Sequence, residues 1–518
     1  MKVVLLLIAV GVHAATFDVK TFGAKGDGVA LDSPAINRAI EAAAAAGGGT
    51  VVLPAGTYLA GSIALKSNIE IHFEPGAKLE ATADAAAYEA PEPNEFTKYQ
   101  DFGHSHWRNS LLWGIGLENV AITGNGLIFG KGLSRGEGSK GGNKSIALKL
   151  CRNVTIRDIS ILSGGHFAIL ATGVDNLTID NVKIDTNRDG IDVDACRNVR
   201  ISNASVNSPN DDAIVLKSSF ALGFARATEN VTLTNSFVSG YDIGSLLDGT
   251  YKRNVVRVPD REGPTGRVKF GTESNGGFKN ITISNIVFDR SRGLALETVD
   301  GGNIEDIAIS NLTMRDVSNS PIFIRLGSRQ RAPEGTAVAV VRRISISNVV
   351  VYDADPRFPS IIAGIPGHDV EDVKLNGIHI VQRGGLTLDD VAKQPANLVN
   401  TFFFRAQGGV PPREAYDTPE REKEYPEPAM FGLLPAYGFY IRHARGVVLH
   451  DVDVSFAKED TRPAFFVEDV NGIEFEHVRA KKSGAVPTFV LKKVEGFSVR
   501  QSSPVADTKV EKTVWKEF

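Results

Sequence analysis

The chain has 518 residues, with 57 lysines and arginines against 61 aspartates and glutamates, so its formal net charge is −4. A charge this close to neutral provides no polybasic field and argues against a nucleic-acid or anionic-membrane partner. The length would allow two or three globular domains, but 52 glycines and few helix-favouring runs suit a protein with many tight corners.

The N-terminus has the pattern of an export signal. Lys2 provides a basic start, residues 3–12 are apolar, and Ala14 places a small residue at the expected cleavage position. About ten apolar residues are too few to span a bilayer. We therefore expect a signal peptide over residues 1–14, export to the periplasm or the exterior, no membrane span, and one mature domain over 15–518.

A short helix is expected near the start of the mature chain. Asp32 or Ser33 can cap it, Pro34 suits its first turn, and residues 36–46 are strong helix formers that end at Gly47. We expect this amphipathic helix to cover the open end of a stack of strands, because an unpaired edge invites aggregation.

A recurring phrase of Asn followed by alternating aliphatic residues occupies most of the chain. Clear copies begin at Asn119, Asn153, Asn176, Asn198, Asn230 and Asn280, and degenerate copies at Asp306, Arg343, Asp372, Gly446 and Gly472. The tightest spacings, 23 and 22 residues, predict a single-stranded parallel β-helix with one coil per repeat. A β-sandwich or propeller is the alternative, but propeller blades need roughly 40–50 residues. Stacked Asn side chains should form a hydrogen-bonded ladder.

The only two cysteines, Cys151 and Cys196, both open the phrase Cys-Arg-Asn-Val and are 45 residues apart, which equals two tight coils. At about 4.8 Å per layer, the two positions should lie roughly 10 Å apart, beyond the reach of a disulfide. We expect two free, buried thiols.

Three acids should gather on neighbouring coils. Asp189 and Asp211 are 22 residues apart, one tight coil, and Asp212 adds a third carboxylate. Like charges so close raise at least one pKa, which provides a protonated acid beside an ionised base, the pair that glycoside hydrolysis requires. The alternatives are acids of ordinary turns or a calcium site.

Residues 385–440 interrupt the repeat. This segment contains seven prolines and the charged run 420–424. It is expected to leave the coil as a long excursion, either as a solvated surface loop or as a wall of the substrate groove.

Several of these segments resemble the polygalacturonase family, glycoside hydrolase family 28, and particularly its bacterial members. Residues 187–192 read Asn-Arg-Asp-Gly-Ile-Asp, and residues 210–218 read Asn-Asp-Asp-Ala-Ile-Val-Leu-Lys-Ser. Residues 17–27 and 271–277 are also similar to that family. The resemblance is specific from about residue 17 to 320 and looser beyond.

The resemblance implies an all-β, right-handed parallel β-helix that hydrolyses pectic α-glycosidic bonds with inversion and needs no cofactor or metal. By motif, Asp211 would be the general acid, while Asp189 and Asp212 would activate water. Inversion leads us to expect a carboxyl separation of about 6.5–9.5 Å. The partner would be a pectic polysaccharide or oligosaccharide, bound by a monomer.

The chain departs from the family pattern at two places. Thr265 stands where the family's Gly-His-Gly motif has its histidine, and Ala295-Leu296-Glu297 replaces the Arg-Ile-Lys motif that grips a galacturonate carboxylate. An acid facing that carboxylate would repel it. We therefore expect rhamnogalacturonan or a modified galacturonan rather than plain homogalacturonan.

Three further residues are candidate substrate-binding groups. Lys217 follows the acid pair on the same strand, His166 lies one repeat before Asp189, and Arg325 could compensate for the altered grip. Parallel β-helices also include polysaccharide lyases, in which the acids would bind calcium, and non-catalytic carbohydrate-binding modules. The sequence leaves the choice between internal and chain-end cleavage open.

Overall fold

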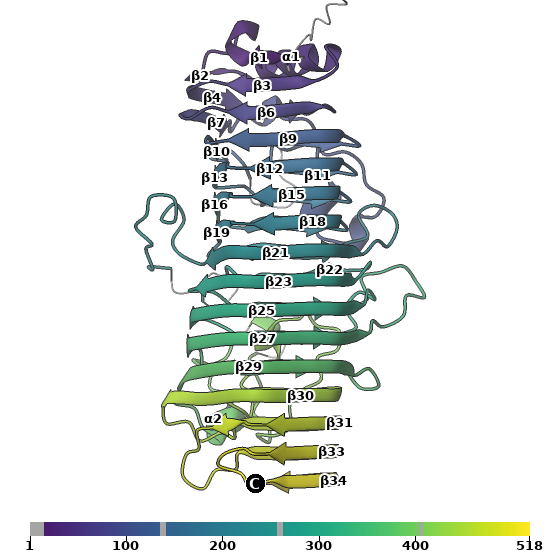
Figure 1. The fold of residues 1–518 in the computed structure, drawn as a ribbon, viewed down its shortest axis with the longest axis vertical. Coiled ribbons are helices and arrows are strands. Elements are labelled where there is room, and N and C mark those ends of the chain that lie inside the picture. Colours follow the sequence, from purple (N-terminus) through teal and green to yellow (C-terminus); the bar gives the residue numbers. More distant parts are fainter. Residues whose placement is uncertain (1–14, 135–140, 256–262, 401, 405–407) are drawn as a thin grey trace, which may run out of the picture.

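The computed structural model describes residues 15–134, 141–255, 263–400, 402–404 and 408–518. The expected signal peptide over 1–14 lies outside the described residues. The described chain winds into one long stack of parallel strands, with the N-terminal coils at one end and the C-terminal coils at the other (Figure 1). The predicted parallel β-helix is confirmed.

Three columns of strands form the walls of the stack. The first column contains β5 (Ile63–Ala64), β8 (Leu112–Ile115), β11 (Lys144–Lys149), β14 (Phe167–Thr172), β17 (Asp189–Asp194), β20 (Ile214–Ser218), β22 (Val268–Ser274), β24 (Leu294–Thr298), β26 (Ile322–Leu326), β28 (Ser360–Ala363) and the start of β30 (Phe439–Lys458). The second contains β1 (Thr16–Asp18), β3 (Gly49–Leu53), β6 (Ile69–Phe73), β9 (Glu118–Gly124), β12 (Arg152–Arg157), β15 (Asp175–Asp180) and β18 (Arg197–Ser202). The third contains β2 (Asp27–Leu31), β4 (Gly56–Ala60), β7 (Ala77–Ala81), β10 (Leu127–Phe129), β13 (Ser160–Leu162), β16 (Lys183–Asp185) and β19 (Ser205–Asn207).

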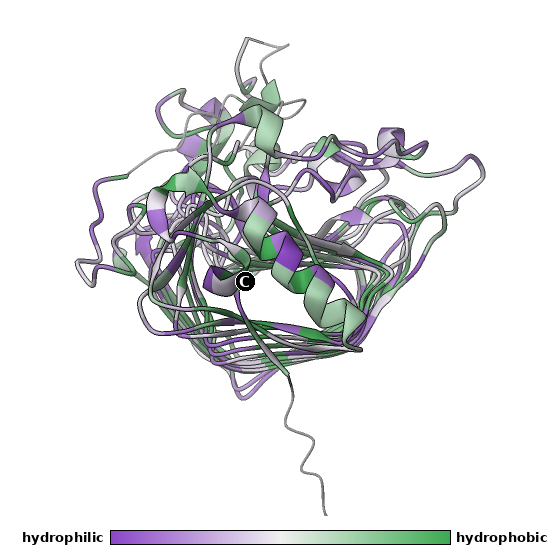
Figure 2. Ribbon diagram, turned by 90° about the horizontal axis from the view of Figure 1, so that it is seen from above, coloured by the Kyte–Doolittle hydropathy of each residue, from purple (hydrophilic) through white to green (hydrophobic). Residues whose placement is uncertain are grey.

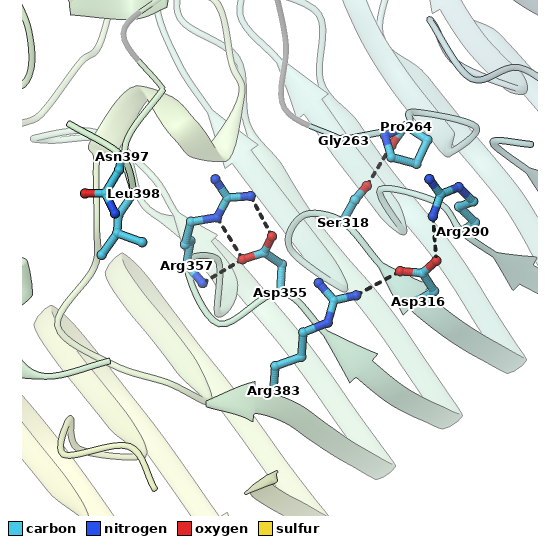
Figure 3. Close-up of a pocket in the computed structure, with 10 residues that line it drawn as sticks. All are labelled: Gly263, Pro264, Arg290, Asp316, Ser318, Asp355, Arg357, Arg383, Asn397 and Leu398. Carbon is cyan, nitrogen blue, oxygen red and sulfur yellow. Dashed lines mark hydrogen bonds and ion pairs between the residues drawn. The ribbon is translucent and has the colours of Figure 1, made fainter. Parts of the chain in front are cut away.

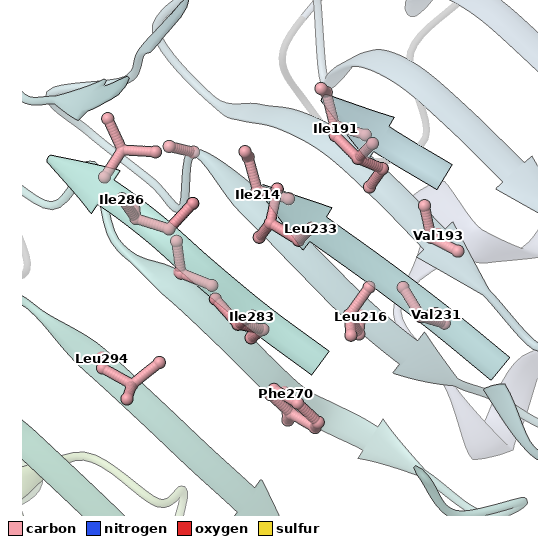
Figure 4. Close-up of a cluster of buried hydrophobic side chains, with 14 of the residues drawn as sticks. Ile191, Val193, Ile214, Leu216, Val231, Leu233, Phe270, Ile283, Ile286 and Leu294 are labelled. Carbon is pink, nitrogen blue, oxygen red and sulfur yellow. The ribbon is translucent and has the colours of Figure 1, made fainter. Parts of the chain in front are cut away.

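Later coils join the second and third columns in long bent strands. These are β21 (Thr228–Ser239), β23 (Phe278–Asp289), β25 (Ile304–Val317), β27 (Val341–Ala354), β29 (Val370–Gly384) and β30, which also continues the first column. In the last coils β31 (Phe465–Glu476) and β33 (Phe489–Arg500) join the first and second columns, and β32 (Arg479–Ala480) lies beside β30. Aliphatic side chains point inward from all three walls and fill the interior, as Figure 4 shows around Ile191, Ile214 and Leu233.

The two ends of the stack are covered. Helix α1 (Ser33–Ala45) lies across the N-terminal end (Figure 2) and buries Ile36 and Ile40, as predicted. Its capping differs from the prediction: the Asp32 carboxylate accepts from the backbone N–H groups of Lys25 and Gly26 instead of capping the helix. At the other end, β34 (Thr508–Glu517) pairs with β33 in antiparallel fashion.

The predicted Asn ladder is confirmed. Each side-chain amide donates to the Asn one layer before it, for example Asn176 to Asn153 at 2.9 Å and Asn280 to Asn230 at 2.8 Å. These positions have a left-handed backbone, with φ of 57° at Asn176, a conformation that Asn tolerates well. The degenerate copies keep that conformation, since Asp306 and Gly446 also have positive φ.

Cys151 and Cys196 are free and buried, as predicted. Cys151 lies one layer before Val174 and two before Cys196, since the adjacent strands keep Arg152, Asp175 and Arg197 in register. No helix among the described residues is both long and apolar enough to cross a bilayer.

The excursion between β29 and β30 spans residues 385–438 and packs tightly on the stack. It contains α2 (Leu388–Lys393) and a 3-10 helix, Pro428–Phe431. Met430 and Phe431 are buried against Phe323 and Tyr440. The solvated-loop interpretation is therefore wrong for its second half.

Candidate active site

The three acids singled out in the sequence meet on the first column of strands. Asp189 opens β17, and Asp211 and Asp212 lie in the turn that precedes β20. The backbone N–H of Asp212 donates to Asp189 Oδ1 and to Asp211 Oδ1, each at 3.1 Å. One carboxylate oxygen from each residue lies within 4.8 Å of the others. This limit applies to the nearest oxygens, whereas the separation of about 6.5–9.5 Å expected for inversion is one between carboxyl groups and stays a prediction.

Burial controls the ionisation of this cluster. Asp189, Asp211 and Asp212 are at most 5% exposed. Burial, together with the charges of Asp211 and Asp192, raises the pKa of Asp189 well above its usual value. Because the carboxylates interact so closely, their protons belong to the set rather than to one residue. Burial and the neighbouring negative charges therefore favour a proton retained within this set of acids.

Lys217 lies beside the cluster, where the sequence placed it. Its ammonium is 3.7 Å from Asp189 Oδ2 and 3.2 Å from Glu273 Oε2. It also lies 2.8 Å from His104 Nε2, which accepts a hydrogen bond from it. Burial and the Lys217 charge lower the pKa of His104 well below its usual value, so the imidazole is neutral. The sequence analysis did not identify His104, because this residue lies in an insertion outside the repeat.

Asp192 faces the same space from the middle of β17. Its carboxylate is 3.6 Å from Lys217 and 3.6 Å from His104, and it accepts no hydrogen bond from the described residues. Burial raises the pKa of Asp192 to about 7. It is therefore a buried carboxyl that can exchange a proton near neutral pH.

His166 contacts an arginine that lies beside the acids. Its Nε2 is 3.1 Å from an Arg188 Nη2, and Arg188 Nε lies 3.3 Å from Asp211 Oδ2. Burial and the Arg188 charge lower the pKa of His166 well below its usual value. The neutral His166 ring thus accepts a hydrogen bond from Arg188 and orients its guanidinium group.

Two basic residues that the sequence analysis overlooked contact the third acid. Arg267 Nε donates to Asp212 Oδ1 at 2.6 Å, and Lys269 Nζ is 3.3 Å from Asp212 Oδ2. Both also approach Glu297, at 3.8 and 3.6 Å. Their alternation with the buried Val268 and Phe270 could have placed them on the outer face of this column. Basic side chains are therefore present beside Asp212, although Thr265 and Glu297 replace the basic residues of the family motifs.

The 385–438 excursion forms one wall of the site. Glu427 accepts a hydrogen bond from Arg267 at 3.1 Å and lies 3.3 Å from Arg292, and the Tyr425 hydroxyl is 2.9 Å from Lys269 Nζ. These contacts agree with the interpretation of this segment as a wall of the substrate groove rather than as a solvated surface loop.

Arg325 supports that wall and does not reach the acids. Its guanidinium donates to the backbone carbonyls of Gly364, Glu420 and Arg421 and lies over the Phe431 ring. The expectation that it replaces the lost carboxylate grip is therefore corrected.

A separate cavity of about 340 Å³ opens beside the turns that precede the first column (Figure 3). Its arginines are paired with acids: Arg290 and Arg383 with Asp316, and Arg357 with Asp355. None of the three clustered acids lines it. We therefore place the candidate catalytic site at Asp189, Asp211 and Asp212 and not in this cavity.

Comparison with known proteins agrees with this architecture. A family model described as "Rhamnogalacturonase A/epimerase, pectate lyase-like" matches residues 16–161, and "Right handed beta helix region" matches residues 100–256. Two solved structures share the fold over almost the whole chain. An exopolygalacturonase from Thermotoga maritima has a TM-score of 0.56 at 18% identity, covering 97% of this chain and 94% of that one. A family 28 exopolygalacturonase from Yersinia enterocolitica has a TM-score of 0.62 at 16% identity, covering 95% and 79%.

Curated relatives connect the sequence to one family. A probable polygalacturonase from Vitis vinifera is 25% identical over 59% of this chain, which spans less than two thirds (62%) of that relative. An exo-poly-alpha-D-galacturonosidase from Dickeya chrysanthemi is 23% identical over 70% of this chain and 67% of its own length. A polygalacturonase from Gossypium hirsutum is 30% identical over 62% of this chain and 74% of its own length. The chain belongs to the polygalacturonase family of glycoside hydrolases.

Proposed function

We propose that this protein hydrolyses α-glycosidic bonds of a pectic polysaccharide and inverts the anomeric centre. The observation that carries the proposal is the buried group formed by Asp189, Asp211 and Asp212. One water with two hydrogen bonds of about 2.8 Å can bridge acceptor oxygens about 4.8 Å apart. One carboxylate oxygen of Asp189 and one of Asp212, the two residues that the family resemblance assigns to water activation, lie within that distance of each other.

Asp211 is then the proton donor. Burial and its acidic neighbours raise the pKa of Asp189, and Arg188 Nε lies 3.3 Å from Asp211 Oδ2. Proton transfer from Asp189 to Asp211 on substrate binding would leave Asp189 as the base and Asp211 as the acid. The cluster holds the proton that this step needs.

Hydrolysis is favoured over calcium-dependent elimination by the cations around the acids. Each acid has a basic group within 4 Å: Lys217 at Asp189, Arg188 at Asp211 and Arg267 at Asp212. A divalent cation at this place would be repelled by three positive charges. The buried cluster of acids that share a proton also argues against a non-catalytic binding module, because binding alone does not require such a cluster.

We propose rhamnogalacturonan or a modified galacturonan as the substrate. Arg267, Lys269 and Arg292 face Asp212, Glu297 and Glu427. Burial raises the pKa of Glu297 to about 7, so above that pH three negative charges meet three positive ones and leave no surplus positive charge for a second uronate at this wall. The description of the matching N-terminal family model, which names a rhamnogalacturonase, supports this choice. Export through residues 1–14 and action as a monomer belong to the same proposal.

Product analysis tests the proposal. The purified protein is incubated with homogalacturonan and with rhamnogalacturonan backbone oligomers, and reducing ends, near-ultraviolet absorbance and the anomer first formed are measured. We expect reducing ends without new absorbance on rhamnogalacturonan, with inverted product by NMR. Absorbance would indicate a lyase, the retained anomer would reject inversion, and faster cleavage of homogalacturonan would reject the substrate assignment.

A further inference from the structure

The turn between the second and third columns changes its chemistry in the last coils. In earlier coils this turn carries stacked asparagines, such as Asn285, Asn311 and Asn348, whose amides bond from layer to layer. In the last three coils the same left-handed position holds Asp451, His477 and Gln501. The position before it holds, in register, Asn376, His450, Glu476 and Arg500. Gly377 interrupts the asparagine ladder in the coil before Asp451, and beyond it one imidazole, His477, occupies the ladder position while a second, His450, occupies the position before it.

The replacement brings two histidines and an aspartate together on strands β30 and β31, which are adjacent in the stack (Figure 1). Asp451 Oδ2 is 3.1 Å from His450 Nδ1, and Asp451 Oδ1 is 3.4 Å from His477 Nδ1. One donor atom of each residue lies within 4.8 Å of the others, and the two rings are 5.3 Å apart. The group lies on a turn of the outer surface, on different strands from the clustered acids.

Oxygen atoms lie beside both rings. His477 Nε2 is hydrogen-bonded to the side-chain oxygen of Gln501, and its Nδ1 is on the side of the Asp451 carboxylate. His450 Nδ1 lies 2.9 Å from the side-chain oxygen of Asn376 as well as 3.1 Å from Asp451, and His450 Nε2 lies 4.0 Å from Glu476 Oε2. An ion bound here would take the place of Asn376 at His450 Nδ1. A metal-binding histidine usually has its second nitrogen held by an oxygen, as Gln501 holds His477.

We propose that His450, Asp451 and His477 form a surface site for a divalent transition-metal ion of the Zn²⁺ type. With metal–ligand bonds of about 2.0–2.1 Å, a tetrahedral site holds its ligand atoms about 3.3 Å apart. The two nitrogen–oxygen separations already match that value. Two imidazoles and one carboxylate suit Zn²⁺, Ni²⁺ or Cu²⁺ rather than Ca²⁺ or Mg²⁺, which prefer oxygen ligands. All three side chains are more than one third exposed, so water can complete the coordination.

The bound ion would fasten the two adjacent coils that carry β30 and β31. Its ligands come from consecutive layers, so the ion replaces the amide–amide bonds that the ladder loses there. Because a metal that binds only the folded chain shifts the unfolding equilibrium, the C-terminal coils become more resistant to unfolding when it is present. This site is independent of the proposed hydrolysis.

Zn²⁺ titration of the tag-free, chelator-stripped protein tests the site, with calorimetry for stoichiometry and affinity and Co²⁺ absorption for coordination. We expect one equivalent of tightly bound Zn²⁺ and a higher melting temperature. His450→Asn and His477→Asn, which restore the amide type of the ladder, should each weaken Zn²⁺ binding at least tenfold with unchanged circular dichroism.

Two control variants separate this site from other sources of metal binding. His379→Asn removes an exposed histidine that also lies near an acid, with its Nδ1 3.7 Å from Asp453, but has no second imidazole. Asp211→Asn alters the group formed by Asp189, Asp211 and Asp212, in which one carboxylate oxygen from each residue also lies within 4.8 Å of the others but which is surrounded by cations. Both should keep the tight site. The inference is overturned if Zn²⁺ does not bind, or if its affinity falls no more in His450→Asn and His477→Asn than in the controls.

Discussion

At the scale of single residues, Asp211 is the most direct test of the catalytic assignment. Asp211→Asn keeps the shape of the side chain but removes the proton donor, so we expect kcat to fall by at least about 10²-fold, the usual contribution of general acid–base catalysis. Circular dichroism should be unchanged. Asp372→Asn, on an exposed turn, is the matched control and should keep full activity. Substantial turnover by Asp211→Asn would remove Asp211 from the mechanism.

Glu297 determines the charge balance beside Asp212. Glu297→Gln is isosteric, and burial raises the pKa of Glu297 to about 7, so above that pH the substitution leaves Arg267 and Lys269 with one negative neighbour fewer and the site gains a net positive charge. We expect the kcat/KM for homogalacturonan to rise several-fold relative to that for rhamnogalacturonan, measured by reducing ends on both substrates. Glu118→Gln, which alters an exposed ion pair with Arg152, should not change the ratio. An unchanged ratio in Glu297→Gln would mean that this acid does not select the sugar.

Asp192 should make stability depend on pH. Burial raises its pKa to about 7 from the model-compound value of 3.8. Between these values the folded state retains a proton that the unfolded state has lost, so the free energy of unfolding falls as pH rises, by at most about 1.4 kcal/mol per pH unit. Urea denaturation at pH 5 and pH 7 should show a smaller fall in Asp192→Asn than in the unchanged chain. Equal falls would indicate that Asp192 is already ionised at pH 5.

At the scale of elements, the regular coils were predictable and the insertions were not. The repeat predicted the strands, the Asn ladder, the two free thiols and the meeting of Asp189 with Asp211, because each coil places equivalent residues one above another. The partners that complete the site come from outside the repeat. Lys217 meets His104 across 113 residues, and Arg267 meets Glu427 across 160. No local pattern encodes such contacts, since they depend on how two irregular segments fold back onto the stack.

Those two insertions should also determine where the polymer is cut. His104 comes from residues 82–111 and Glu427 from residues 385–438, and together they leave the three acids at most 5% exposed. A groove open at both ends would leave its acids more accessible to a long polymer. We therefore expect cleavage from a chain end, with reducing ends accumulating while the viscosity of the polymer falls little. A steep early loss of viscosity would show internal cleavage and an opening through these segments.

At the scale of the whole molecule, stability comes from stacking, without a disulfide, and the ends of the stack are its weak points. Strand β34 covers the last coil, and Phe518 packs on Phe489 and Phe497 with ring centroids 6.1 and 5.4 Å away. Removing residues 508–518 would expose these rings and the unpaired edge of β33, a template for pairing with another chain.

We therefore expect the shortened protein to have a lower melting temperature and to form aggregates that light scattering detects at concentrations where the full chain remains dispersed. Val514→Lys is the matched control: Val514 is 79% exposed on the same strand, so a charge there preserves the cap and should leave both measurements unchanged. If the shortened chain stayed dispersed with an unaltered melting temperature, β33 would close the stack by itself. The aromatic layers beneath it, where Phe465 stacks on Phe439 and Phe489, would then be sufficient to hold the C-terminal coils together.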